Sequence, residues 1–403
     1  MPDDGFRTRL EILQPADAQA RVPALRETRN PQIWVHRYTN AETGWVLSIA
    51  THGEPGSGQL SLGGFRIAPA ARVESPGYDN DAEAIGLAIG MEEKVHWSRV
   101  IRAGGPLGRE HVGQLVGGKC VLLPTADARI GQPRDFALLD WALQCFHDFE
   151  RSSGVRLNTG QDLGHGIMSD GRTASLAYLG ERFHGCVFAD TSKPTGEGNY
   201  HVLKGMLDAL GVPLASARVG LIGCGNIGEW ILRRLVAQGA TVAALEARPA
   251  TRDRLRAEAG VDVRPPEAKP AFLAEPFDAV VVNANGGTLD LATCEAIARN
   301  PRVRVVCGSE NLTMPDVRGA ELLQAAGKVY APTEFGGMMG YLTAVEEYLA
   351  RHAGRPFELA TMLEAARRLE EAGREVTQHV RAAGFALSFE DAVAEVYEAR
   401  VAT

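Results

Sequence analysis

Residues 219–228 read VGLIGCGNIG, a short apolar run that leads directly into the glycine pattern Gly-x-Gly-x-x-Gly. Sequence compatible with a helix follows at once. In a strand–turn–helix unit of this kind, Gly223 allows the tight turn and Gly225 lets the backbone approach a pyrophosphate. The third glycine, Gly228, lets the helix pack closely against the strand. The pattern therefore predicts a dinucleotide-binding loop.

Two further features specify the predicted cofactor. Asn226 and Ile227 open the helix, whose first N–H groups are suited to binding phosphate. Glu246 ends the next apolar run, about 20 residues after the first glycine, where an acidic residue accepts the ribose hydroxyls. A carboxylate there repels a 2′-phosphate and favours NAD over NADP, although Arg248 could accommodate that phosphate.

The same half of the chain contains further short apolar runs at residues 241–245, 279–282, 303–306 and 328–331. Helix-compatible sequence follows these runs. Strands that are apolar throughout are typical of a parallel sheet covered by helices on both faces. We therefore predict an α/β fold with a doubly wound Rossmann domain over residues 200–335.

The first half differs in the spacing of its predicted strands and helices. This pattern predicts a second α/β domain over residues 1–195. Its predicted strands are residues 33–38, 45–50 and 120–123, and its predicted helices are residues 81–91 and 136–149. Residues 1–30 are polar and unpatterned, which suggests a loose arm. The C-terminal helices, residues 340–403, are expected to pack back towards the first domain.

Composition excludes several classes of protein. The 403 residues include 42 Lys and Arg against 50 Asp and Glu, with no basic stripe, which disfavours nucleic-acid and anionic-membrane partners. No apolar run is long enough to span a membrane. The acidic start, Met1–Asp4, lacks an export segment. The six cysteines include no CxxC pair, which favours a reduced cytoplasmic protein. The histidines lack a zinc-binding spacing, so no metal site is predicted.

Several segments place glycines next to charged or polar residues in a fixed order along the chain. They are LGGFR (62–66), GMEEK (90–94), VGGKCV (116–121), NTGQDLG (158–164), GNYHVLKGM (198–206), GSEN (308–311), YAP (330–332) and EE (346–347). In order these segments resemble the Glu/Leu/Phe/Val amino-acid dehydrogenases, most closely the leucine and phenylalanine branch. The resemblance covers nearly the whole chain from about residue 32.

The resemblance implies three charged catalytic and substrate-binding residues. Lys94 matches the lysine that holds the substrate α-carboxylate, Lys119 matches the catalytic lysine, and Asp162 matches the aspartate that shuttles protons. This chemistry needs such residues, because a desolvated lysine has a lowered pKa and can activate water for attack on an imino acid.

The resemblance also implies the lining of both sites. Gly63 and Gly64 match the glycine pair that lines the amino-acid site, and Leu62 and Gly160 stand at positions that line an apolar pocket. A glycine at position 160 favours a bulky aliphatic or aromatic substrate side chain. In the nucleotide domain, the remaining predicted cofactor contacts are Asn285 and Asn311.

The predicted function is therefore NAD-dependent oxidative deamination, or reductive amination, of an apolar L-amino acid by a homo-oligomer. The other reactants would be a 2-oxo acid and ammonia. Two alternatives stay open. One is an NAD-binding regulator or partner subunit that has lost the chemistry, and the other is a dehydrogenase of an unusual amino or imino acid in a biosynthetic pathway.

Some residues depart from the family pattern. Lys94 and Lys119 are further apart than in the family, which an insertion within residues 95–116 would explain. A competing alignment puts Pro106 at the position of the catalytic lysine. Residues 337–340, GMMG, replace a family Asn-Ala-Gly-Gly stretch. The inserted segment either lines the substrate site or forms a solvated loop, and its polar residues are Arg99, Arg102, Arg109 and His111.

Overall fold

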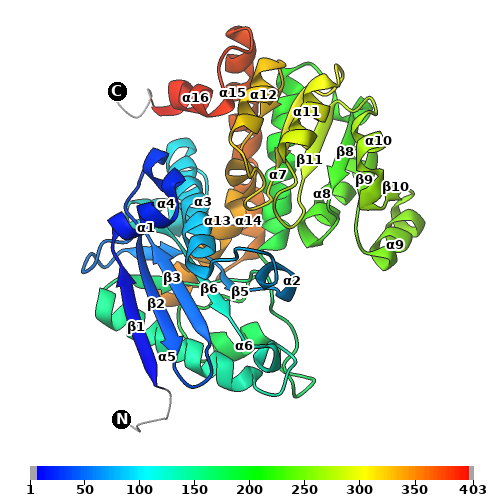
Figure 1. Ribbon diagram of the computed structural model, residues 1–403. Coiled ribbons are helices and arrows are strands. Elements are labelled where there is room, and N and C mark those ends of the chain that lie inside the picture. The colour runs from blue at the N-terminus through cyan, green and yellow to red at the C-terminus, as the bar shows by residue number, and fades with distance from the viewer. Residues whose placement is uncertain (1–6, 399–403) are drawn as a thin grey trace. The chain divides into compact units, whose positions relative to one another are not determined.

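The computed structural model describes residues 7–398, and the chain divides into two compact units, each with its own sheet (Figure 1). Unit 1 contains the described residues up to Val95, then Pro106–Asp190 and Thr343–Phe357. Unit 2 contains His96–Gly105, Thr191–Leu342 and the described residues from Glu358 onward. The predicted α/β fold class is confirmed.

Unit 1 is built on a mixed seven-stranded sheet in the order β1-β2-β3-β6-β4-β7, with β5 also paired to β6. Strands β1, β2, β3 and β6 pair antiparallel, whereas β4 and β5 run parallel to β6. The strands are β1 (Thr8–Leu13), β2 (Trp34–Asn40), β3 (Val46–Thr51), β4 (Leu60–Leu62), β5 (Phe65–Ile67), β6 (Leu115–Leu123) and β7 (Arg156–Asn158).

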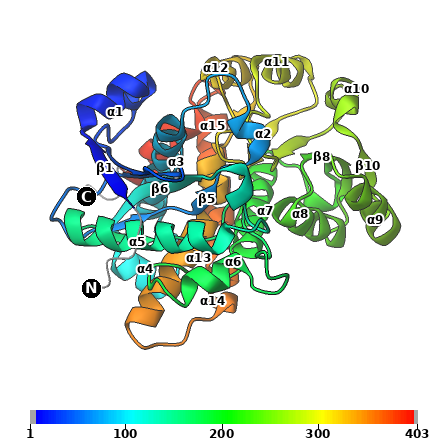
Figure 2. The ribbon, with the colours of Figure 1, turned by 60° about the horizontal axis from the view of Figure 1, so that its bottom comes forward.

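The two faces of this sheet differ in polarity, because successive side chains of a strand point to opposite faces. One face carries Ile49, Phe65 and Cys120, which belong to the apolar core formed with helix α5 (Asp135–Ser153). Figure 2 shows α5 along that side of the sheet. The opposite face carries Arg66 and Lys119 beside their strand partners Val121 and Ala50. This second face contains buried charged side chains and is the polar face of the sheet.

The polar face is covered by the long helix α3 (Asn80–Ile101). At its first residue, Asn80 donates through Nδ2 to Ser48 Oγ at 2.9 Å and to the Val121 carbonyl at 3.0 Å. Further along, Gly117 N donates to Glu92 Oε2 at 2.6 Å. The remaining helices of unit 1 are α1 (Pro15–Arg21), α2 (Ala70–Val73), α4 (Pro106–Glu110) and α6 (Ser175–Gly180).

The expectation of a loose N-terminal arm is wrong for the described residues from Arg7 onward. Strand β1 pairs antiparallel with β2 as an edge strand of the sheet, and Ala18 and Leu25 after it are fully buried. An edge strand with one solvated face contains few apolar residues, and for this reason its sequence looked unpatterned. Residues 1–6 of the expected arm lie outside the described residues, as do residues 399–403 of the predicted C-terminal helices.

Unit 2 contains the predicted doubly wound sheet. Its six strands are all parallel and run in the order β10-β9-β8-β11-β12-β13, the arrangement of a dinucleotide-binding Rossmann fold. The strands are β8 (Arg218–Ile222), β9 (Thr241–Leu245), β10 (Asp262–Arg264), β11 (Ala279–Val282), β12 (Val305–Gly308) and β13 (Val329–Tyr330).

Helices flank this sheet, and Figure 1 shows α11 next to α12. From residue 192 onward the helices are α7 (Ser192–Ala209), α8 (Asn226–Ala237), α9 (Pro249–Ala259), α10 (Lys269–Leu273), α11 (Leu291–Arg299), α12 (Arg318–Ala325), α13 (Thr333–His352), α14 (Leu359–Ala365), α15 (Arg368–Ala382) and α16 (Phe389–Val393). The C-terminal helices follow the expected packing towards the first domain only in part. Helix α13 passes from unit 2 into unit 1, whereas α14, α15 and α16 belong to unit 2, where α15 packs on α7. Among residues 7–398, no helix is both long and apolar enough to cross a membrane.

Candidate functional site

The glycine loop of unit 2 has the geometry that its sequence predicts. Gly223 adopts a φ of +91°, and a Cβ there would lie 2.6 Å from the Asn283 carbonyl oxygen. A Cβ at Gly228 would lie 2.0 Å from the Gly223 carbonyl oxygen. Gly225 differs, because a Cβ there would meet no atom within 4 Å. Two glycines are therefore required by close packing, and the third faces open space next to the start of α8.

That open space suits a pyrophosphate. Asn226 is the first residue of α8, with Ile227 after it, and Gly225 caps the helix with extended backbone. A helix of this length presents N–H groups and a positive dipole end at its N-terminus. The residues present therefore fit the phosphates of a dinucleotide.

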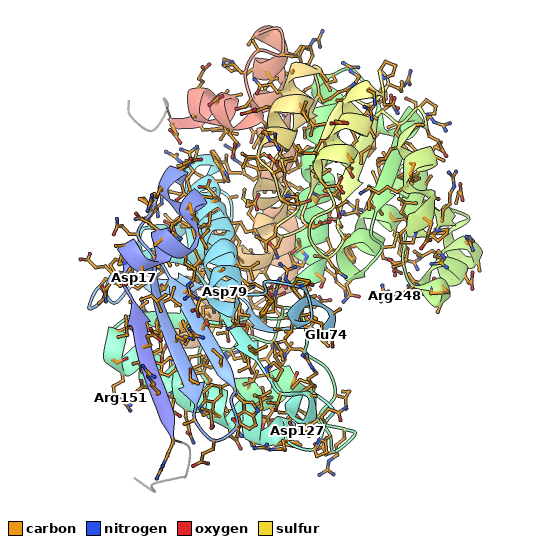
Figure 3. The ribbon with its side chains drawn as sticks, in the orientation of Figure 1. Asp17, Glu74, Asp79, Asp127, Arg151 and Arg248 are labelled. Atoms are coloured by element: carbon orange, nitrogen blue, oxygen red, sulfur yellow. The ribbon has the colours of Figure 1, made fainter. Side chains whose placement is uncertain are left out.

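Glu246 follows β9 and is 7% exposed. Its carboxylate accepts hydrogen bonds from Cys224 N at 2.8 Å and Arg248 N at 2.9 Å, and the Arg248 guanidinium lies 3.1 Å away. Burial would raise the pKa of Glu246, but these N–H groups and the Arg248 charge lower it below its usual range. The carboxylate is therefore ionised and fixed beside the glycine loop, while Arg248 is largely exposed (Figure 3).

The other two predicted cofactor residues lie in loops after β11 and β12. Asn285 is exposed and Asn311 is half-buried. Both loops are held by Glu310, whose carboxylate accepts from Ala284 N at 2.8 Å and from Thr288 N at 3.0 Å. Asn283 also belongs to this region, and its buried Nδ2 has no hydrogen-bond partner among the residues that the structure describes.

In unit 1, the GGK motif lies on β6, and both glycines are required by packing. A Cβ at Gly117 would lie 2.3 Å from Glu92 N on α3, and one at Gly118 would lie 2.2 Å from Ser61 Oγ on β4. Lys119 follows them and is buried at 4% exposure. The motif therefore brings β6 close to both neighbours and places a lysine inside the unit.

The predicted glycine pair lies against this lysine. A Cβ at Gly63 would lie 1.9 Å from the Gly118 carbonyl oxygen. A Cβ at Gly64 would lie 2.9 Å from Lys119 Nζ and 3.1 Å from Asp162 Cβ. The lysine side chain thus passes next to Gly64, at a point where any side chain would displace its ammonium group.

Lys119 Nζ forms a buried ion pair with Asp162 Oδ2. Burial lowers the pKa of Lys119, Asp162 opposes this effect, and the nearby Arg66 adds to it, so that the pKa lies below that of an ordinary lysine. Burial would raise the pKa of Asp162, but Lys119, Arg66 and the N–H of Leu163 lower it well below its usual range. The structure therefore brings Lys119, Asp162, Gly63 and Gly64 together.

Arg66 and Glu83 belong to the same cluster, and neither was predicted from the sequence to have a role. Arg66 Nε lies 3.2 Å from Asp162 Oδ2, and its Nη1 donates to Glu83 Oε1 at 2.6 Å. Arg72 Nε lies 2.9 Å from the same Glu83 oxygen. The sequence feature that could have indicated a role for Arg66 is its position as a charged residue between two apolar ones in the strand Phe65–Ile67.

The remaining predicted residues of unit 1 are Lys94, Leu62 and Gly160. Lys94 is 6% exposed on α3, two residues after the Glu92 contact with β6. Leu62 is buried on β4, paired with Gly117. A Cβ at Gly160 would lie 3.4 Å from Val187, an ordinary packing distance.

The inserted segment is ordered and belongs partly to each unit. Helix α3 continues to Ile101, and Pro106 is the exposed first residue of α4. Glu346 on α13 accepts from Leu107 N at 3.1 Å and from Gly108 N at 2.8 Å, which fixes α4. Arg99, Arg102 and Arg109 are exposed and His111 is half-buried. No group of side chains suited to holding a metal ion occurs within residues 7–398.

Comparison with known proteins agrees with this architecture. Residues 218–284 match the family described as NADP oxidoreductase coenzyme F420-dependent. No curated protein sequence matches the chain.

Solved structures are similar over nearly the whole chain. The L-tryptophan dehydrogenase of Nostoc punctiforme superposes with a TM-score of 0.61 at 18% identity, covering 91% of this chain and 96% of that one. The hetero-hexameric glutamate dehydrogenase of Thermus thermophilus gives a TM-score of 0.61 at 16% identity, covering 96% and 86%. The glutamate dehydrogenase of Peptoniphilus asaccharolyticus gives 0.56 at 15%, covering 94% and 96%. The chain therefore has the fold of two-domain amino-acid dehydrogenases, as its sequence motifs predicted.

Proposed function

We propose that this protein is a nicotinamide-dependent dehydrogenase that converts an L-α-amino acid to a 2-oxo acid and ammonia, and that it also catalyses the reverse reaction. The observation that carries the proposal is the buried Lys119–Asp162 pair next to Gly63 and Gly64. The pair occurs in a chain with the fold of amino-acid dehydrogenases. A buried lysine with a lowered pKa is the general base that this reaction needs.

In this proposal, unit 1 supplies the residues that act on the amino acid. Lys94 holds the α-carboxylate and so orients Cα. The amine loses a proton and Cα loses a hydride, which a bound nicotinamide ring would accept, and an imino acid results. Lys119 takes a proton from water as the water oxygen attacks the imino carbon. Asp162 is the group that accepts the amine proton at the start, and it then returns this proton to the nitrogen of the water adduct. As the C–N bond breaks and ammonia leaves, Asp162 takes the hydroxyl proton and the 2-oxo acid forms, and the protons on Asp162 and Lys119 pass to solvent.

Unit 2 supplies the residues that would hold the cofactor. The N-terminus of α8, with Gly225 and Asn226, would bind the pyrophosphate, and Glu246 would accept the ribose hydroxyls. Asn285 and Asn311 would contact the rest of the dinucleotide. The ionised Glu246 carboxylate supports NAD rather than NADP, because it would repel a 2′-phosphate.

The cofactor preference can be tested with Glu246→Ala. We expect this variant to narrow the preference for NAD over NADP by about 10-fold, because a hydrogen bond to a charged group is worth about 1.5–3 kcal/mol. The measurement is the Kd of each cofactor by calorimetry. Glu258→Ala is the control, because Glu258 is an exposed residue of α9 paired with Arg233. If the ratio of the Kd for NADP to the Kd for NAD were the same in the wild type and in Glu246→Ala, Glu246 would not be the residue that selects NAD.

The substrate class is proposed to be apolar, branched-chain or aromatic amino acids. Leu62 supports this class, because it places an apolar side chain directly before the glycine pair. Gly160 adds room next to Val187. The test is NADH formation with a panel of L-amino acids at alkaline pH. Turnover of glutamate or aspartate in preference to leucine or phenylalanine would overturn this substrate class.

The rate should depend on pH in opposite senses for the two directions. Lys119 must be neutral to take a proton from water, so oxidative deamination should accelerate as the pH rises through its lowered pKa. Reductive amination needs the protonated lysine and should slow over the same range. The measurement is kcat/KM against pH in both directions, and two parallel profiles would contradict this role of Lys119.

The same assays separate the two alternatives. NADH binding without turnover of any amino acid, or of any 2-oxo acid with ammonium, would indicate a regulator or partner subunit. Turnover of an unusual amino or imino acid alone would indicate a specialised biosynthetic dehydrogenase. The homo-oligomer and the cytoplasmic location stay predictions, and light scattering of the purified protein tests the first of them.

A further inference from the structure

Arg66 is a buried cation in contact with the Lys119–Asp162 pair, and its own side chain is 5% exposed. Its Nε lies 3.2 Å from Asp162 Oδ2 and its Nη2 lies 3.3 Å from Asp162 Oδ1, so the guanidinium spans both carboxylate oxygens. Its third contact is Nη1 to Glu83 Oε1 at 2.6 Å. A fork of this kind fixes both the position and the plane of a carboxylate.

We propose that Arg66 is a positioning residue that compensates the charge of Asp162 and thereby allows Lys119 to lose its proton, with Glu83 setting the strength of this effect. The catalytic part of this inference, that a neutral Lys119 acts as a base, rests on the proposed dehydrogenase function. The charge coupling itself can be measured without that function.

Without Arg66, Lys119 would face Asp162 as a simple buried ion pair. A lone buried Asp–Lys pair favours the doubly ionised state, because each charge stabilises the other and separation leaves one of them unpaired. A lysine held in such a pair stays protonated and cannot act as a base. Asp162 alone would therefore work against the role proposed for Lys119.

The charges around Asp162 change this balance. Asp162, Arg66, Glu83 and Arg72 alternate in sign and contact one another in sequence, so together they carry no net charge. The Arg72 side chain is 35% exposed, whereas Arg66 and Lys119 both contact the one buried carboxylate of Asp162. A protonated Lys119 is therefore a second cation on a carboxylate that Arg66 already compensates, whereas a neutral Lys119 adds no charge. Desolvation then favours the neutral amine.

The other groups that face Lys119 do not supply a compensating charge. The Cys120 thiol is buried, which raises its pKa to about 12 and keeps it neutral. His165 is bound to the Phe65 carbonyl at 2.7 Å, and burial lowers the pKa of its ring so that it is neutral as well. Leu163 N donates to Asp162 Oδ1 at 2.7 Å and helps to fix the carboxylate. Asp162 and Arg66 are therefore the charged groups that act most directly on Lys119.

The test uses two variants with expected effects of opposite sign. Arg66→Gln removes the cation from Asp162 and should move the titration midpoint of Lys119 to higher pH. Glu83→Gln removes the anion that shares Arg66 and should move the midpoint to lower pH. A purely structural role for either residue would not produce opposite shifts, and Arg66→Lys should restore part of the wild-type midpoint by restoring the charge.

The readout is NMR of protein labelled with ¹³C at the lysine ε-carbons. The chain has only six lysines, so the signal of Lys119 can be assigned by comparison with Lys119→Met. Arg37→Gln is the control, because Arg37 also pairs with a buried carboxylate, Asp81 at 3.4 Å, but does not touch Asp162. Unmoved midpoints in both Arg66→Gln and Glu83→Gln, or shifts of the same sign, would overturn the proposal.

Kinetics provides the second readout. Arg66→Gln should lower kcat of oxidative deamination at neutral pH by about 10-fold, since general-base catalysis follows the protonation state of the base. The rate should recover at higher pH while KM changes little. If the wild type oxidises no amino acid, the dehydrogenase function fails but the NMR midpoints still test the coupling. If the wild type is active and the pH profile of Arg66→Gln is unchanged, the positioning role fails alone.

Discussion

Lys119→Ala is expected to lower turnover by about 10³-fold, the order of effect seen when a general acid–base group is removed. Cofactor binding should be unchanged, because the glycine loop and Glu246 belong to the other compact unit. The fold should persist, since Asp162 keeps its contacts with Arg66 and with Leu163 N. The measurements are kcat with the best amino acid of the panel and the Kd of NAD.

A second buried lysine provides a matched control for this experiment. Lys328 is 7% exposed, burial lowers its pKa, and its Nζ donates to the Asn300 carbonyl at 2.6 Å in unit 2. Lys328→Ala should therefore reduce stability but leave kcat unchanged. If both variants lost turnover equally, the loss would reflect removal of a buried lysine in general and not removal of a base.

Chemical rescue sharpens the assignment of Lys119. Truncation to alanine leaves a cavity next to Asp162 and Gly64, into which a small primary amine could bind. Added ethylamine should restore part of the rate, and the restored rate should follow the concentration of the unprotonated amine. A Lys119→Ala enzyme that keeps most of its rate without added amine would show that another group is the base.

Local patterns were sufficient to predict the Rossmann unit. The apolar runs at Thr241–Leu245 and Ala279–Val282 coincide with β9 and β11, because strands buried on both faces must be apolar throughout. The edge strand β10, Asp262–Arg264, was not predicted, because an edge strand is short and partly polar. Burial on two faces therefore decides which strands can be recognised from the sequence.

The charge cluster of unit 1 could be predicted only in part. Lys119 and Asp162 were found because each lies in a motif, whereas the role of Arg66 depends on partners distant in the sequence. The alternation Phe65, Arg66, Ile67 puts the charged side chain on the face opposite to the two apolar ones, but it does not show that all three residues are buried or which partners Arg66 has. The pairing of Cys120 with Phe65 determines which residues share a face of the sheet. It is a contact between distant parts of the sequence and cannot be predicted from a local pattern.

Gly63→Ala is expected to lower both activity and stability. The added Cβ would lie 1.9 Å from the Gly118 carbonyl oxygen, and no rotation of a side chain can relieve a contact between two backbone segments. Either β4 and β6 separate or the segment carrying Lys119 shifts. We expect the free energy of unfolding to fall by about 3 kcal/mol, the upper end for overpacking. Turnover should fall by about 10²-fold, the cost of misplacing a reacting group by about 1 Å.

Alanine substitutions at two other glycines of the same unit distinguish two causes of the expected loss in Gly63→Ala: a clash between backbone segments and displacement of the Lys119 side chain. Gly113→Ala is the control, because a Cβ there meets no atom within 4 Å and its φ is not positive, so stability and rate should stay at wild-type values. Gly64→Ala should behave differently from both, since its nearest contact is the flexible end of Lys119 at 2.9 Å. It should displace the ammonium group from Asp162 and reduce turnover with little change in the melting temperature. Equal loss of stability in Gly63→Ala and Gly64→Ala would mean that the lysine is as rigid as the backbone beside it.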